Sequence, residues 1–265
     1  MPQNPVIAKF GQVSGATGPV GSPGGMDLQQ MYDAPSYAGP RPNVRYLTLD
    51  DVIVRTASML AVLFATGAVS WGLTSTKGAG PLIFVGLIGG FGLAMYMSFT
   101  ARANAVTALA YAAFEGLLLG AVSRMFNEAW HGIVIQAVTG TVCVAGGMLL
   151  VYRTGAIRVT PKFTRMVWSG LIGVFGLIIV NGLASLFHHG GLGLFDTAHP
   201  AIAIVFSLVC IALAASMLVV DFDMIEKAIR SGADQKFAWY AAFGLMVTLI
   251  WLYTEILQLL SYLRD

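Results

Sequence analysis

Seven long apolar runs divide most of the chain, and polar residues, Gly or Pro separate each run from the next. Each run is close to the roughly 20 residues that an α-helix needs to cross a bilayer. Because lipid offers no hydrogen-bond partner to an open backbone amide, each run is expected to be helical. The pattern predicts an all-α integral membrane protein with seven transmembrane helices, at residues 57–73, 82–99, 106–123, 132–152, 166–187, 200–220 and 241–263.

The basic residues fall unevenly on the two sides of this predicted bundle. Twelve of the 15 Lys and Arg residues lie before the first run or after the second, fourth and sixth runs, and three lie on the other side. The positive-inside rule then places the N-terminus in the cytoplasm and the C-terminus outside.

The first 45 residues follow a different pattern. They hold seven Gly and seven Pro and few large aliphatic residues, a composition that cannot bury a core. We therefore expect a disordered cytoplasmic tail at 1–45, which serves as a spacer or binds a partner, and a seven-helix transmembrane domain at 46–265.

Composition narrows the function further. Of the 265 residues, 57% are hydrophobic and 11% charged, with a mean hydropathy of +0.75, whereas an average soluble domain has about 25% charged residues. This excludes a soluble enzyme and a nucleic-acid partner. The chain has none of the patterns His-Glu-x-x-His, Gly-x-Ser-Gly or Gly-x-Gly-Asp, and no Cys/His spacing typical of zinc. We therefore expect that the protein is not an enzyme and that it has neither a metal site nor a cofactor.

One segment occurs almost twice. Residues 86–93 read GLIGGFGL and residues 170–177 read GLIGVFGL, seven of eight identical, 84 positions apart. The match favours two three-helix halves, the second inverted in the membrane because each half has an odd number of spans. The alternative is that the match arose by chance in a Gly-rich chain.

The pairs Gly86/Gly90 and Gly116/Gly120 have the spacing that lets helices approach closely.

Acidic residues occur at membrane depth, where they are costly by about 2.5–3.5 kcal/mol on insertion scales. Glu115 lies within the third run and Glu255 within the seventh, while Asp221 ends the sixth and Asp223 follows it. For Glu115 the alternative is a structural contact between helices. Tyr111, one turn earlier in the same run, is placed to hydrogen-bond to it.

The seventh run places Glu255 on a polar face. Thr248, Trp251, Glu255 and Gln258 follow +3, +4, +3 spacing, which puts them on one side of a helix. Two carboxyl groups that share a low-dielectric site resist simultaneous ionisation, so their charge depends on pH. When charged they attract cations, and calcium prefers oxygen ligands of this kind.

Three segments carry a family resemblance. Residues 221–226 read DFDMIE, residues 252–260 read LYTEILQLL, and residues 114–120 read FEGLLLG. They resemble the Bax inhibitor-1 (transmembrane Bax-inhibitor-motif) family, as a bacterial-type member, over residues 46–265. In that family the sixth helix ends in an Asp-containing turn and the seventh carries a Leu-Tyr-x-Asp-x-x-Asn-Leu segment. The chain departs from the family at Glu255 and Gln258, which stand in place of Asp and Asn.

The resemblance implies a multi-pass protein, here of a bacterial plasma membrane, with the seventh helix central between two three-helix halves. It further implies a pH-sensitive calcium leak gated by a carboxylate pair, formed by Asp221 and Glu255. Asp223 is the alternative to Asp221 on register grounds, and Arg102 is the candidate for an arginine that latches the closed state.

Three functions stay open from the sequence. The first is the pH-gated calcium leak, in which calcium is the permeant ion rather than a cofactor. The second is a proton-coupled secondary transporter, which the internal repeat and the buried acids suit equally. The third is a regulator of integral membrane partners such as membrane proteases, without transport. The lipid bilayer, calcium and protons are the expected partners.

The loop between the fifth and sixth runs contains a cluster of titratable residues. It is either a pH or metal sensor or a solvated loop, and its residues are His188, His189, Asp196 and His199.

Overall fold

The computed structural model describes residues 45–186 and 200–264, so the predicted tail and the histidine-containing loop lie outside the described residues. The described part is helical apart from loops and an isolated bridge between Tyr46 and Asp234. All its helices are long and apolar enough to cross a membrane, which confirms the predicted fold class. In chain order they are α3 (Leu49–Lys77), α4 (Gly80–Thr100), α5 (Ala105–Ala129), α6 (Ile133–Arg153), α7 (Pro161–Ser185), α8 (Pro200–Arg230) and α9 (Phe237–Tyr262).

Two helices extend well beyond their apolar runs. Helix α3 begins eight residues before the predicted span, because Thr48 caps it and exchanges hydrogen bonds with Asp51 in a capping box. Helix α8 continues ten residues past the predicted end at Val220. Ion pairs one turn apart, Asp223 with Lys227 and Glu226 with Arg230, support that extension.

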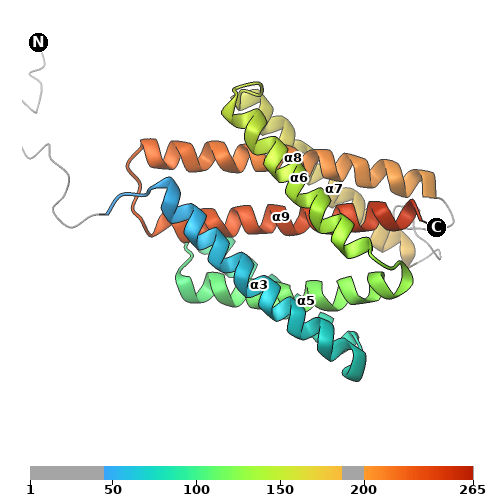
Figure 1. Ribbon diagram of the computed structural model, residues 1–265. Helices are drawn as coiled ribbons and strands as arrows, with labels where there is room; N and C mark the ends of the chain where they lie inside the picture. Colours follow the sequence, from blue (N-terminus) through green and yellow to red (C-terminus); the bar gives the residue numbers. More distant parts are fainter. Residues whose placement is uncertain (1–44, 187–199, 265) are drawn as a thin grey trace, which may run out of the picture. The chain divides into compact units, whose positions relative to one another are not determined.

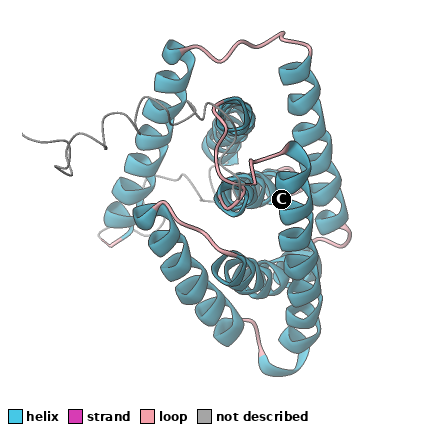
Figure 2. Cartoon of the chain, turned by 90° about the vertical axis from the view of Figure 1, so that its left-hand side faces the viewer, coloured by secondary structure: helices cyan, strands magenta, loops and turns pink. Residues whose placement is uncertain are grey.

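The helices pack as two groups of three with α9 between them. Helix α5 packs against α3 and α4, and α8 packs against α6 and α7. Helix α9 packs against α3, α5, α6 and α8, and both ribbon views place it between α5 and α8 (Figures 1 and 2). An inverted relation between the two groups stays a prediction.

Small residues make the α3–α5 interface close. A Cβ added at Gly120 would lie 2.3 Å from the backbone oxygen of Gly67, and one at Gly116 would lie 2.5 Å from the backbone oxygen of Leu63. The Ser70 hydroxyl donates to the backbone oxygen of Leu117 at 2.6 Å. The packing role predicted for this glycine pair is therefore confirmed.

The repeated glycine segment has a similar position in both groups. Gly86 faces Leu118 of α5, with 2.8 Å from an added Cβ to the Leu118 Cβ, and Gly170 faces Leu213 of α8, with 2.6 Å to its Cδ2. In each group the first glycine of the segment thus allows the second helix to approach the third.

A polar network joins the start of α3 to the loop between α8 and α9. The Leu47 amide donates to the Ala233 oxygen at 2.8 Å, and the Gln235 amide donates to the Arg45 oxygen at 2.9 Å. The Arg55 guanidinium donates to the Gln235 backbone oxygen at 2.6 Å, while the Gln235 side chain donates to Asp51 at 2.6 Å. This end of α9 is therefore fixed to α3.

Candidate functional site

Asp221 is buried at the α8–α9 interface, with 4% of its surface exposed. The Thr248 hydroxyl of α9 donates to Asp221 Oδ2 at 2.7 Å. On the same face of α9, a Cβ added at Gly244 would be 4.0 Å from the other carboxyl oxygen, so glycine leaves room beside it. An acid at the end of an apolar run is thus held by one hydroxyl donor on the facing helix.

Glu255 is also buried, at 7% exposure, and lies deeper along α9. Its Oε1 accepts a hydrogen bond from the Trp251 indole nitrogen at 3.1 Å. Its Oε2 is buried with no hydrogen-bond partner among the described residues. The neighbouring polar group on α8 is the Cys210 thiol, a weak donor. Glu255 therefore keeps acceptor capacity that the described protein does not satisfy.

The two carboxyls have separate partners and lie at separate levels. Thr248, which binds Asp221, is seven residues before Glu255, or about 10 Å along the helix axis at 1.5 Å per residue. Cys210 is in turn eleven residues before Asp221 on the antiparallel helix. The structure therefore brings Asp221 to Thr248 and Glu255 to Cys210, and it does not bring the two carboxyls together as a hydrogen-bonded pair.

Asp223 has a different environment from Asp221. It pairs with Lys227 of the same helix at 2.5 Å and its side chain is 19% exposed. Two residues along a helix point to opposite sides, so Asp223 lies away from the α8–α9 face that holds Asp221. Glu226, one turn beyond Phe222, accepts a hydrogen bond from Tyr152 of α6.

Glu115 lies at the α4–α5 interface rather than beside the other acids. The Tyr111 hydroxyl one turn earlier interacts with its carboxyl, as the spacing predicted. A Cβ added at Gly90 of α4 would lie 2.9 Å from Glu115 Oε1, so the carboxyl packs directly against this glycine. The ring of Tyr111 packs edge-on against Phe243 of α9, with 5.0 Å between centroids.

Arg102 is exposed in the short loop between α4 and α5. Among the ion pairs of the described residues, none joins Arg102 to Asp221. The latch stays a prediction that this conformation does not display. Within residues 45–186 and 200–264, no group of three or more His, Cys, Asp or Glu side chains is placed to hold a metal ion.

The sequence predicts the polar face of α9 but not the partners that this face has on α8. It did not pair Thr248 with Asp221, because a helical period gives the face of a residue and not its partner on another helix. The sequence also gives no role to Cys210, which is buried beside Glu255, whereas Cys143 is exposed. The eleven-residue spacing from Cys210 to Asp221 is three helical turns, a signal that places both on one face.

Comparison with known proteins gives one family. A family model described as Bax inhibitor 1 like matches residues 4–265, nearly the whole chain. No curated protein matches the chain significantly.

Proposed function

We propose, from the premise that this chain belongs to the Bax inhibitor 1 like family, that it is a pH-sensitive cation leak channel which conducts calcium. One observation carries the proposal. Two buried carboxyl groups, Asp221 and Glu255, lie at successive levels along the interface of two membrane-spanning helices.

Energetic cost supports a functional role for these acids. An ionisable side chain at membrane depth is costly to insert, and such residues usually face a bundle interior or an aqueous path. Asp221 receives a single protein donor, and one oxygen of Glu255 receives none among the described residues. Both can therefore accept a proton or contribute an oxygen to a passing cation, and calcium prefers carboxylate oxygen.

The spacing of the two acids refines how they act. Because Thr248, the partner of Asp221, precedes Glu255 by about 10 Å of helical rise along α9, a cation would meet the two carboxyls one after the other. Each is then an independent proton-binding position, and the path needs no direct contact between them. No catalytic step and no cofactor enters this proposal.

Calcium flux into dye-loaded liposomes that contain the purified full chain tests the proposal. We expect flux above that of empty liposomes, and a lower flux in Glu255→Gln, which removes the charge at the deeper level. The matched control is Glu128→Gln, an exposed glutamate that pairs with Arg124 of the same helix at 2.5 Å. Folded protein with no flux between pH 6 and 8, or equal flux in both variants, would overturn it.

A proton-coupled transporter is the second candidate, and the two three-helix groups around α9 favour it. Inverted repeats are common in secondary transporters, with the substrate site at the repeat interface. Saturable solute uptake that is stimulated by counter-flow would support this candidate, whereas a leak channel gives neither saturation nor counter-flow. If neither flux nor uptake occurs, the regulator of membrane partners is the hypothesis that remains.

The orientation of the chain in the membrane is part of the same proposal. We place the N-terminus in the cytoplasm and the C-terminus outside a bacterial plasma membrane. The cysteine in Ser231→Cys, in the loop between α8 and α9, should react with a membrane-impermeant maleimide only after the cells are permeabilised. Labelling in intact cells would show that the chain has the opposite orientation.

A further inference from the structure

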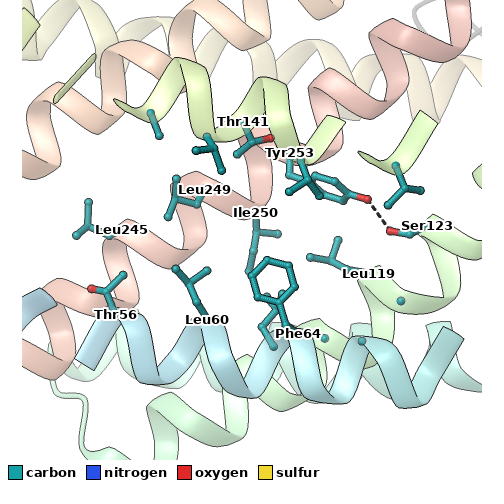
Figure 3. A pocket seen from close by; sticks show the side chains of 18 of the residues that line it. Thr56, Leu60, Phe64, Leu119, Ser123, Thr141, Leu245, Leu249, Ile250 and Tyr253 are labelled. Atoms are coloured by element: carbon teal, nitrogen blue, oxygen red, sulfur yellow. Dashed lines mark hydrogen bonds between the residues drawn. The ribbon is translucent and has the colours of Figure 1, made fainter. Parts of the chain in front are cut away.

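A cavity of about 780 Å³ lies between α3 and α6. These two helices are not among those that pack closely within the described bundle, and α5, α8 and α9 contribute to its lining. Figure 3 shows Leu60 and Phe64 of α3 across the space from Thr141 of α6, with Leu249 and Ile250 of α9 between them. The cavity spans the middle of two membrane-crossing helices and so lies at the depth of the hydrocarbon core.

The lining is mostly apolar, and three of its four hydroxyl-bearing side chains have hydrogen-bond partners. It contains no charged side chain. The Ser123 and Tyr253 hydroxyls hydrogen-bond to each other at 2.6 Å (Figure 3), and the Thr141 hydroxyl donates to the Ala137 backbone oxygen at 2.8 Å. The Thr56 hydroxyl is buried and has no hydrogen-bond partner among the described residues. Because the Thr56 hydroxyl is the one unpartnered hydroxyl in the lining, a polar ligand or water would lose most of its hydrogen bonds here, and the chemistry favours an apolar occupant.

Size then decides between the apolar occupants that a membrane offers. An α-helix about 10 Å wide and 30 Å long fills roughly 2,400 Å³, so a transmembrane helix of a partner or a second copy does not fit whole within the cavity. A flexible acyl chain is narrow enough, and the volume is within the roughly 300–1,000 Å³ of small-molecule sites. The rim includes Phe64 at 57% and Val142 at 65% exposure, so the opening faces the lipid.

We propose that the α3–α6 cavity binds one acyl chain of a bilayer phospholipid. The occupied cavity would contact Leu249, Ile250 and Tyr253 of α9. By helical periodicity these residues point away from the face that bears Trp251 and Glu255. The bound chain therefore supports α9 from the side opposite the carboxyls, where it fills the space beside Leu249, Ile250 and Tyr253. This site does not depend on the proposed ion conduction.

Native mass spectrometry of the full chain, extracted from phospholipid vesicles into mild detergent, tests the proposal. We expect one retained phospholipid per chain. Gly146→Phe should abolish retention, because Gly146 lines the cavity and an added Cβ meets no atom within 4 Å, so the ring enters the open space. Gly147→Phe is the matched control, since Gly147 is equally open but is not part of the lining.

A second pair on α3 keeps the test valid if the first variant fails to fold. Ala68 lines the cavity and Ala65 does not. Ala68→Phe should lose the lipid and Ala65→Phe should keep it. The proposal is overturned if the unmodified chain retains no lipid, or if the lining and control variants retain it equally. Loss of a dimer peak in place of a lipid in the lining variants would likewise overturn it and assign the cavity to a second copy.

Discussion

Thr248 is the residue on which the placement of the Asp221 carboxyl depends, because its hydroxyl is the one described donor to that group. Asp221 is 4% exposed in this conformation, so little solvent reaches it to replace a lost donor. At the scale of single residues, the candidate site is therefore an acid with one hydrogen bond from the facing helix and spare capacity to accept others.

Thr248→Val keeps the shape of the side chain and removes this donor. Leaving a buried acceptor unsatisfied costs about 1–3 kcal/mol, so we expect a lower Tm in detergent. Thr139→Val is the control, because the Thr139 hydroxyl donates only to the Ile135 oxygen of its own helix at 2.8 Å. Equal Tm values for the two variants would show that the contact with Asp221 adds no stability.

At the scale of elements, the apolar runs were sufficient to predict all the helices, since a bilayer leaves the backbone no other choice. The helix ends were not predictable from hydropathy. The start of α3 depends on the Thr48–Asp51 capping box, and the end of α8 on ion pairs between residues one turn apart. The face of α9 followed from its spacing, whereas the pairing of Asp221 with Thr248 required the register of two helices, which no local pattern contains.

The α3–α5 interface gives a prediction at this scale. In Gly120→Ala the new methyl would lie 2.3 Å from the Gly67 oxygen and 2.8 Å from the Ser70 Cβ. Backbone must move to admit it, and overpacking of this kind costs about 1–3 kcal/mol. We expect a lower Tm. Gly92→Ala, on the open side of α4 with no atom within 4 Å, should leave Tm unchanged or raise it. An unchanged Tm in Gly120→Ala would mean that the two helices are not closely packed.

At the scale of the whole described bundle, α9 connects the two groups of three helices. Its start is hydrogen-bonded to α3 through the network around Gln235, and its middle binds Asp221 of α8 through Thr248. Its side opposite Glu255 borders the α3–α6 cavity. The cavity could not be predicted from sequence, because it results from the absence of close packing between α3 and α6 rather than from any residue pattern.

Arg55→Ala tests the network at the start of α9. It removes a hydrogen bond to the Gln235 oxygen and a cation–π contact with Trp239, where the guanidinium lies 5.4 Å from the ring centroid. We expect faster amide hydrogen exchange at residues 45–48 and 231–238 and unchanged exchange in α5. The exposed Arg158→Ala serves as the control. Protection that stays the same at both segments would show that Arg55 does not hold them together.

Whether Asp221 makes the channel pH-sensitive is tested by the pH response of calcium flux in Asp221→Asn, measured in liposomes at pH 6 and pH 8 beside Asp223→Asn. The amide introduced by Asp221→Asn can still accept from Thr248 but cannot titrate, so the variant keeps the hydrogen bond and loses the proton. Asp223 is two residues away and already paired with Lys227. We predict that Asp221→Asn loses the difference in flux between the two pH values, whereas Asp223→Asn retains it. A pH response that persists in Asp221→Asn, or that disappears in Asp223→Asn alone, would show that Asp221 is not the group that makes the flux depend on pH.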